Sequence, residues 1–398
     1  MIHHHRKHKF LFRAAHFAKE LAKRGHDITA ICISEKNHFR INQYKDDGVF
    51  YVESPDLLFG QVRSGWDVWN TISRILFLRK KEFDLIYAFE TRPATIYPIK
   101  YISKKKRTPL VIDWVDWWGH GGLISENRPR WYQLLFGRME TYYEENFRHL
   151  ADGTVVISSG LINRAIKLGL DQNTIVEIPN GAVTDGIKVV DSKAYRKQFV
   201  IPHDSFVICD TGKDVLIGND LLFKAFKIVL KSHSDVFFLM TGSEKKQFDT
   251  LASEIGINMN FKHLGFLPYR ELQKVITCAD VFVIPFEDKP SNLGRWPGKI
   301  GKYLSQGRPI ISNPVGVMKS LLTEYKIGLL ADETPEDMAE KILFLRDNPK
   351  LCNEFGYNAR KLAENDLNWS KLTDKLELFF EISIQRFRDR KILEMEDT

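Results

Sequence analysis

The stretch ADVFVIPFEDKPSNLGRWPGKIGKYLSQGRPIISNPVG, residues 279–316, decides the fold of this chain. Val281–Ile284 is a run of four apolar residues, as in a parallel strand that is buried on both faces. Pro297 suits the first turn of a helix and Gly307 suits its end, after which Ile310 and Ile311 are apolar again. The stretch therefore predicts a strand, a polar loop, a helix and a second strand of the same sheet.

The polar loop leaves the carboxyl end of its strand, which is where open α/β sheets bind ligands. It carries Asn292 and Arg295, and Lys299 follows near the start of the predicted helix. Free backbone donors and cationic side chains near a helix N-terminus favour an anion. The loop therefore predicts a phosphate site, and the alternative is a sheet loop with no ligand.

Length and composition predict two globular domains. A chain of 398 residues is too long for one ordinary core, and 43% hydrophobic content is ample for folding. No run of 18 apolar residues is present, and the start MIHHHRKHKF lacks the apolar core of a signal peptide, so we expect a cytoplasmic protein. The net charge of +7 fits an anionic ligand, an anionic membrane or nucleic acid, and charge alone does not choose among them.

The cysteines and histidines do not predict a metal centre. Cys32, Cys209, Cys278 and Cys352 lack the paired spacing of a zinc or redox motif, which indicates buried free thiols. The run His3–His5 could bind a metal, but we interpret it as a solvated basic tip.

Apolar runs alternate with helical patterns on both sides of the phrase IPNG, residues 178–181, and the polar segment 182–203 is the best linker. This alternation predicts an α/β fold with doubly wound parallel sheets. Candidate strands are residues 27–33, 83–88, 110–112, 153–158, 175–178, 206–209, 236–240 and 261–267.

The opening stretch resembles the nucleotide-binding loop of glycosyltransferase family 4. The matching residues are Asn292, Arg295, Pro297, Lys299, Ile300, Gly307, Arg308 and Pro309, and the phrases LAKRGHDIT and IPNG are similar to the same family. The resemblance implies two Rossmann-like domains facing across a cleft, the GT-B type. It implies an acceptor-side domain over residues 1–183, a nucleotide-sugar domain over 184–366, and a helical segment over 367–398 that crosses back to the first domain.

The resemblance also implies a function of the hexosyltransferase type: transfer of a sugar from a nucleotide-diphosphate donor to a glycan or lipid-linked acceptor, with retention at the anomeric carbon. It implies no metal or other cofactor and no nucleic acid partner. Asp116 and Glu287 are the catalytic candidates. The donor-binding candidates are Lys213, Gly242, Asn292, Gly294, Arg295, Lys299 and Lys302.

The chain departs from the family at several positions. Gly294 and Lys302 stand where the family has its two glutamates, Val115 stands at the family's histidine, and the first strand with its glycine-rich turn is missing. These departures keep open a noncatalytic homologue that binds nucleotide or glycan, and a nucleotide-sugar epimerase.

Two further features concern partners. The basic segment 6–9 and the aromatic Trp66 and Trp69 predict weak attachment to anionic membranes. Trp114, Trp117 and Trp118 could stack on a sugar or wedge their loop against the domain, and the sequence does not choose between these roles.

Overall fold

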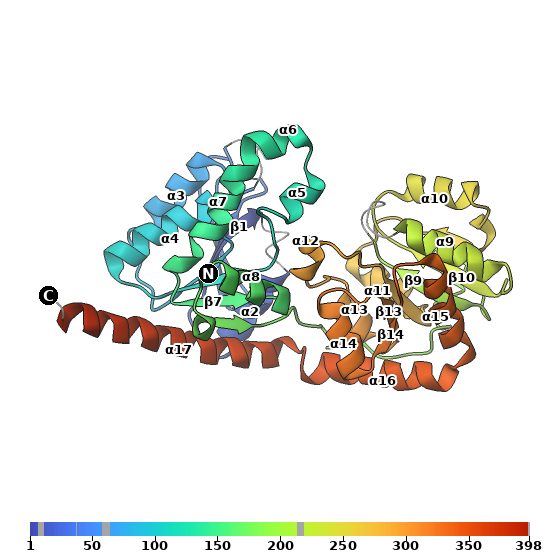
Figure 1. Cartoon of the computed structure of the whole chain (residues 1–398). Coiled ribbons are helices and arrows are strands. Elements are labelled where there is room, and N and C mark those ends of the chain that lie inside the picture. The colour runs from blue at the N-terminus through green and yellow to red at the C-terminus, as the bar shows by residue number, and fades with distance from the viewer. Residues whose placement is uncertain (7–11, 37, 58–63, 213–218, 397–398) are drawn as a thin grey trace. The chain divides into compact units, whose positions relative to one another are not determined.

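The computed structural model describes residues 1–6, 12–36, 38–57, 64–212 and 219–396, and these form two compact units (Figure 1). The first unit comprises Met1–Asn180, Leu293–Trp296 and Trp369–Thr398. The second comprises Gly181–Asn292 and Pro297–Asn368. Each unit is built around its own mainly parallel sheet, which confirms the predicted fold class.

The described residues of the first unit contain an eight-stranded sheet in the order β3-β4-β2-β1-β5-β6-β7-β8. Among the strands that the structure describes here, only the edge pair β3 and β4 is antiparallel. The strands are β1 (Ile2–Arg6), β2 (Thr29–Ile33), β3 (Asn42–Asp46), β4 (Val49–Ser54), β5 (Ile86–Phe89), β6 (Leu110–Trp114), β7 (Gly153–Val156) and β8 (Ile175–Glu177).

The helices of the first unit include one π-helix, η1, which continues α6 into α7. The helical elements are α2 (Arg13–Lys23), α3 (Val68–Leu78), α4 (Pro93–Lys106), α5 (Leu123–Asn127), α6 (Arg130–Tyr132), η1 (Gln133–Gly137), α7 (Arg138–Asn146), η2 (Arg148–Leu150), α8 (Ser159–Lys167), η3 (Gln172–Thr174) and α17 (Trp369–Glu396). None of the described helices is both long and apolar enough to cross a membrane.

The first strand of this unit is present, so the prediction that it is missing was wrong. β1 pairs in parallel with both β2 and β5, in the interior of the sheet. His3 and His4 are buried, which also corrects the interpretation of the histidine run as a solvated tip. Their imidazoles stack on each other, and the His3 ring stacks on Phe89 with 5.1 Å between centroids. Neutral imidazoles thus fill positions that are usually aliphatic.

The described residues of the second unit contain a six-stranded parallel sheet in the order β11-β10-β9-β12-β13-β14. The strands are β9 (Phe206–Asp210), β10 (Val236–Met240), β11 (Phe261–His263), β12 (Val281–Ile284), β13 (Ile310–Ser312) and β14 (Gly328–Leu330). The helices are α9 (Asn219–Leu230), α10 (Lys245–Glu254), η4 (Asn258–Asn260), α11 (Tyr269–Thr277), α12 (Pro290–Leu293), α13 (Ile300–Ser305), α14 (Val317–Tyr325), α15 (Pro335–Asp347) and α16 (Pro349–Asn365).

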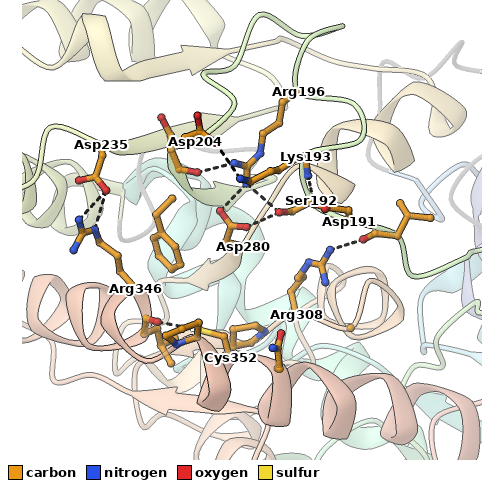
Figure 2. Close-up of a pocket in the computed structure, with 18 residues that line it drawn as sticks. Asp191, Ser192, Lys193, Arg196, Asp204, Asp235, Asp280, Arg308, Arg346 and Cys352 are labelled. Atoms are coloured by element: carbon orange, nitrogen blue, oxygen red, sulfur yellow. Dashed lines mark hydrogen bonds and ion pairs between the residues drawn. The ribbon is translucent and has the colours of Figure 1, made fainter.

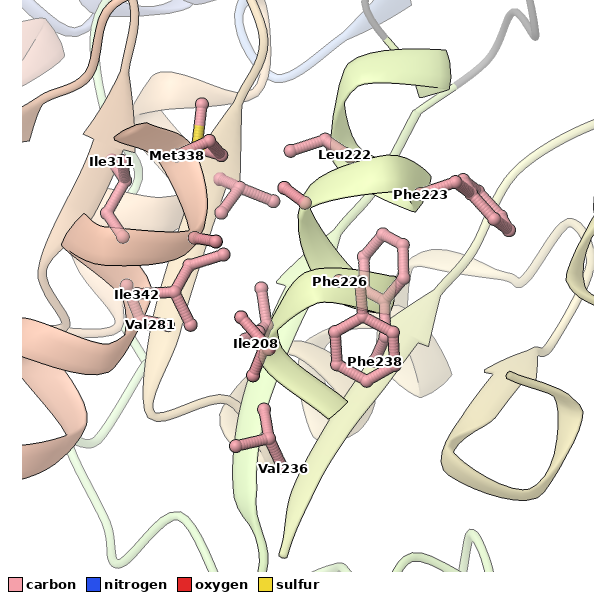
Figure 3. Close-up of a cluster of buried hydrophobic side chains, with 14 of the residues drawn as sticks. Ile208, Leu222, Phe223, Phe226, Val236, Phe238, Val281, Ile311, Met338 and Ile342 are labelled. Carbon is pink, nitrogen blue, oxygen red and sulfur yellow. The ribbon is translucent and has the colours of Figure 1, made fainter. Parts of the chain in front are cut away.

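One face of this second sheet packs against α9 and α15 (Figure 3). Phe223 and Phe226 of α9 and Ile342 of α15 lie over strand residues such as Val281 and Phe238. Burying one such side chain contributes roughly 1.5–3 kcal/mol, so this layer fixes the strands. A rigid sheet is what positions the loops at its carboxyl edge.

The stretch that decides the fold forms the predicted elements. Val281–Ile284 is β12, and β13 pairs with it in parallel. The helix between them begins at Ile300 rather than near Pro297, because Gly298 and Lys299 form a turn first. Gly307 follows that helix with φ of 63°, a conformation that favours glycine.

Candidate functional site

A buried ion pair lies at the carboxyl edge of the second sheet. Asp210 is the last residue of β9 and is 1% exposed, and Lys299 at the start of α13 places its Nζ against Oδ1 of this carboxylate. The pair joins two segments that are 89 residues apart in sequence. In the described part of the chain, the other carboxylate oxygen, Oδ2, is buried without a hydrogen-bond partner.

Tyr303 fastens α13 to the ends of the neighbouring strands. Its hydroxyl donates to Oδ1 of Asp210 over 3.3 Å and accepts from the backbone N–H of Thr211 over 2.8 Å. Its ring stacks on Phe282 of β12, with 3.9 Å between centroids and an interplanar angle of 3°. The start of α13, with Lys299, is therefore held in a fixed position beside β9.

The other donor-binding candidates of the second unit have varied surroundings. The buried amide of Asn292 donates to the backbone oxygen of Glu287 over 2.9 Å, so it shapes the loop. Gly242 follows β10 with φ of 133°, and its N–H donates to Gly265 over 2.9 Å. Lys302 lies partly exposed on α13. Lys213 lies outside the described residues.

Glu287, one of the two catalytic candidates, forms an ion pair with the exposed Lys289. Both residues lie in the loop between β12 and α12. The carboxylate is thus engaged by a neighbouring cation of its own loop.

Asp116, the other catalytic candidate, lies in the loop after β6 of the first unit. Its carboxylate is 3.9 Å from Nε of Arg295, because the segment Leu293–Trp296 belongs to this unit. Burial raises the pKa of Asp116 to about 6, and the positive charge of Arg295 opposes that rise. Ser158 at the start of α8 holds the same segment by donating its hydroxyl to the oxygen of Gly294 over 2.9 Å.

The predicted residues therefore form two groups. Arg295 accompanies Asp116 in the first unit, and Lys299 accompanies Asp210 in the second. Asp210 and Tyr303 were missed by sequence reasoning. The available signal was that Asp210 ends a predicted buried strand, where side chains meet ligands.

Trp114, the last residue of β6, and Trp117 in the loop after it serve largely to fix that loop. Trp114 is fully buried beneath the Arg148 guanidinium, 3.8 Å from the ring centroid, and its indole N–H donates to the oxygen of Asp116. The indole N–H of Trp117 donates to His120 over 2.9 Å, and the Arg164 guanidinium covers its ring.

Glu90, the residue directly after β5, also fixes this loop. Its carboxylate accepts from the backbone N–H of Val115 over 3.0 Å and pairs with Arg148 over 3.2 Å. Burial raises the pKa of Glu90, while Arg148 opposes the rise. The loop that carries Asp116 is therefore rigidly held.

A concave region of about 710 Å³ lies at the opposite end of the second sheet (Figure 2). Asp235 and Asp280 immediately precede β10 and β12, so the region is at the amino ends of the strands. Arg196 pairs with Asp280 over 2.6 Å and Arg346 pairs with Asp235 over 2.8 Å. These ion pairs neutralise the charged side chains and hold the segment after Val190 against the sheet. We therefore interpret the region as structural.

No group of three or more histidine, cysteine, aspartate or glutamate residues within the described ranges is placed to hold a metal ion. Cys32, Cys209 and Cys278 are buried free thiols and Cys352 is partly buried, largely as predicted.

Comparison with protein families matches both units. The family model described as Glycosyl transferases group 1 matches residues 191–362, and the model of Glycosyltransferase Family 4 matches residues 13–185. A GDP-mannose-dependent monoacylated alpha-(1-6)-phosphatidylinositol monomannoside mannosyltransferase of Corynebacterium glutamicum is 25% identical over 190 residues, 47% of this chain and 50% of that protein. The chain thus spans about half the length of this curated relative.

Solved structures share the fold. Sucrose-phosphate synthase of Thermosynechococcus elongatus superposes with a TM-score of 0.72 at 14% identity, over 92% of each chain. Anabaena HepE in complex with UDP and glucose gives a TM-score of 0.64 at 16% identity, over 92% of this chain and 93% of that one. With two parallel-sheet units and two matching family models, this chain belongs to the family 4-like, two-domain glycosyltransferases of the GT-B fold.

Proposed function

We propose that the chain transfers a sugar from a nucleoside-diphosphate donor to a glycan or lipid-linked acceptor, with retention at the anomeric carbon. The observation that carries the proposal is the fixed Lys299 at the carboxyl edge of the second sheet, beside Asp210. Both residues lie in the segment that matches the group 1 family model. The donor's diphosphate is expected there.

The reaction breaks the bond between the anomeric carbon and the β-phosphate oxygen of the donor. A new bond forms to an acceptor hydroxyl oxygen, and nucleoside diphosphate and the hydroxyl proton are released. Negative charge develops on the leaving phosphate, so fixed cationic groups accelerate the step. Lys299 and Arg295 would supply that charge, and the proposal needs no metal for it.

Lys299 is already neutralised in part by Asp210. A bound diphosphate would share the ammonium group, which has three donors, with this carboxylate. The pairing orients Lys299 before the donor arrives, and its contact with phosphate is weaker than that of an unpaired lysine.

Asp116 is the proposed group nearest the reacting sugar or acceptor. A pKa raised to about 6 keeps the carboxylate deprotonated at neutral pH while making it a better base. Its loop is held by Glu90 and Trp114, which favours a positioned role.

The nature of donor and acceptor is drawn from the relatives. One relative is named for GDP-mannose and a phosphatidylinositol mannoside, and one similar structure contains UDP. We propose a GDP- or UDP-linked hexose as donor and an acceptor used in making a polysaccharide or glycolipid. We also propose a cytoplasmic protein with peripheral contact to the inner face of an anionic membrane.

A noncatalytic homologue is the second candidate. Lys302 stands where the family has a carboxylate for the ribose hydroxyls, and an ammonium group cannot accept their protons. Loss of that bond typically costs on the order of 1.5–3 kcal/mol, which would loosen the donor site. A nucleotide-sugar epimerase is the third.

Thermal unfolding in the presence of GDP, UDP, ADP and CMP tests donor binding, because a ligand specific to the folded state raises the midpoint. We expect GDP or UDP to raise it and CMP, which lacks a diphosphate, to leave it unchanged. Absence of a shift with every nucleotide would contradict the donor site. Binding without acceptor-dependent nucleotide release would indicate the noncatalytic homologue, and conversion of the sugar without an acceptor would indicate the epimerase.

A further inference from the structure

The helical segment from α6 through η1 to α7 turns apolar side chains toward solvent. Its exposed members, here called the α6–α7 apolar face, are Trp131 (60% exposed), Leu134 (81%), Leu135 (69%), Met139 (39%) and Tyr142 (52%). Single exposed apolar residues are normal, but a group on one helix face marks a binding surface.

The inner side of this segment is polar, which inverts the usual helix pattern. Glu140 is 5% exposed and accepts a hydrogen bond from the Tyr132 hydroxyl over 2.6 Å. Glu144 is 3% exposed, accepts from the backbone N–H of Trp118 over 3.1 Å, and lies 3.6 Å from Arg164. Carboxylates therefore anchor the helix to the unit, and its apolar residues are left for a partner.

The π-helix η1 also carries exposed apolar side chains. Leu134, Leu135 and Phe136 are consecutive, and each is at least 38% exposed. π-helical turns are rare and are frequently found at functional sites. The rare π-helical conformation thus coincides with three consecutive large apolar residues that face water.

Cationic side chains flank the face. Arg128, Arg130 and Arg138 are exposed and, within the described ranges, form no ion pair. The acids of α7 point elsewhere: Glu140 and Glu144 are buried, and Glu145 pairs with Arg164 over 2.8 Å. Arginine around tryptophan, tyrosine and leucine suits the boundary between anionic headgroups and acyl chains.

We propose that the α6–α7 apolar face, with Arg128, Arg130 and Arg138, docks the chain on the surface of an anionic lipid bilayer. The segment follows β6 and the Asp116 loop, so docking would occur at the carboxyl edge of the first sheet (Figure 1). This inference deepens the membrane contact proposed above and relocates it. Lys7–Lys9 lie outside the described residues, and Trp66 and Trp69 are only partly exposed.

The test is sedimentation of the full chain with phosphatidylcholine vesicles that contain or lack phosphatidylglycerol, without donor or acceptor. Its failure is thus distinct from a failure of the transfer reaction. We expect binding to the anionic vesicles that weakens at high salt. Leu134→Ser with Leu135→Ser should reduce binding at least tenfold, and Arg130→Gln with Arg138→Gln should reduce it about fivefold per arginine on anionic vesicles.

Two control variants keep the test specific. Met259→Ser with Phe266→Ser removes apolar residues that are 85% and 80% exposed in the second unit, and Lys104→Gln with Lys105→Gln removes exposed charge at the end of α4. Both should bind like the wild type. Equal loss in the controls, or no loss in the leucine variant, would overturn the proposal. So would a dimer in sedimentation velocity that only the leucine variant abolishes, together with no vesicle binding.

Discussion

At the scale of single residues, the account depends most on Lys299. Lys299→Ala removes the proposed phosphate contact and leaves Asp210 as a buried carboxylate without its cation. We expect binding of the preferred nucleoside diphosphate to weaken at least tenfold, because charged hydrogen bonds contribute roughly 1.5–3 kcal/mol. Titration calorimetry measures this. Lys231→Ala, which removes an exposed lysine just after α9, is the matched control and should bind normally.

The same reasoning predicts opposite effects on nucleotide binding for substitutions of Arg295 and Lys302. Arg295→Ala should weaken nucleotide binding, whereas Lys302→Glu should leave it unchanged or improve it by restoring an acceptor for ribose hydroxyls. Normal binding by Lys299→Ala and Arg295→Ala, combined with abolished binding by Lys302→Glu, would show that this loop has been assigned wrongly.

The raised pKa of Asp116 leads us to predict a pH dependence of turnover. With its pKa at about 6, kcat/KM should fall about tenfold per pH unit below that value as the carboxylate is protonated. Asp116→Asn should lower kcat by roughly 10² to 10⁴-fold and remove the acidic limb. Glu287→Gln should have the smaller effect, since Glu287 pairs with Lys289. An unchanged acidic limb in Asp116→Asn would exclude this role.

The burial of His3 leads us to predict a pH dependence of stability. Burial lowers its pKa from 6.5 to about 3, so the native state holds a neutral ring while the unfolded chain takes up a proton below about pH 6.5. The contribution of the neutral His3 to the free energy of unfolding is therefore fully present above that pH. It decreases as the pH falls, by on the order of 2 kcal/mol at about pH 5.

The variant His3→Phe should retain the stacking on Phe89 and lose the contribution of residue 3 to the pH dependence, while burial also lowers the pKa of His4 and leaves a smaller drop. Urea denaturation of the first unit at neutral and mildly acidic pH measures the difference. A drop in stability on acidification as large in the variant as in the wild type would contradict the assignment.

At the scale of elements, the contact of α16 with the turn after α13 predicts an unusual glycine effect. Alanine in a helix interior normally stabilises relative to glycine. At Gly356, however, an added Cβ would meet the backbone oxygen of Gly307 well inside contact distance. Gly356→Ala should therefore destabilise the second unit by about 1–3 kcal/mol. Chemical denaturation measures this, with Gly298→Ala, where a Cβ meets no atom within 4 Å, as the neutral control.

The elements that the sequence predicted well are the continuous apolar strands. Val281–Ile284 and Val236–Met240 are buried on both faces of a parallel sheet, so hydrophobicity alone identifies them. β1 was missed because His3 and His4 count as polar, although neutral imidazoles pack in its interior position. The start of α13 was shifted because the turn that follows Pro297 depends on its surroundings, whereas its end at Gly307 was predicted correctly.

The site was less predictable than the fold. Lys299 follows from a local motif, but its pairing with Asp210 spans 89 residues and depends on how β9 and β12 align. The α6–α7 apolar face was invisible for a different reason. Leu134 and Leu135 look like core residues in sequence, and only the burial of Glu140 and Glu144 shows that the helix is inverted.

At the scale of the whole molecule, the first unit is completed by the end of the chain. Figure 1 shows α17 as a long helix that runs beside this unit. Leu372, Leu376 and Phe379 of α17 are buried, and a Cβ at Gly153 of β7 would meet the Phe379 ring at 2.8 Å. The unit therefore needs segments from both ends of the sequence.

A truncated chain ending at Asn368 should lose the cooperative unfolding of the first unit, because three large apolar residues contribute roughly 1.5–3 kcal/mol each. A chain ending at Arg390 retains these residues and the 2.6 Å ion pair to Asp152, and should unfold like the full chain. Thermal unfolding followed by circular dichroism distinguishes the two. An unaltered transition in the shorter chain would contradict the role of α17.

The central claim, that a donor site at the carboxyl edge of the second sheet supports sugar transfer, is tested most directly by one labelled-donor experiment. A donor labelled in its sugar is incubated with the wild type or Lys299→Ala and an acceptor extract, and both free nucleoside diphosphate and labelled acceptor are quantified. The account predicts equimolar formation of the two by the wild type, and at least tenfold less of both by Lys299→Ala at limiting donor. Equal transfer by both proteins, or nucleotide release without labelled acceptor, would contradict it.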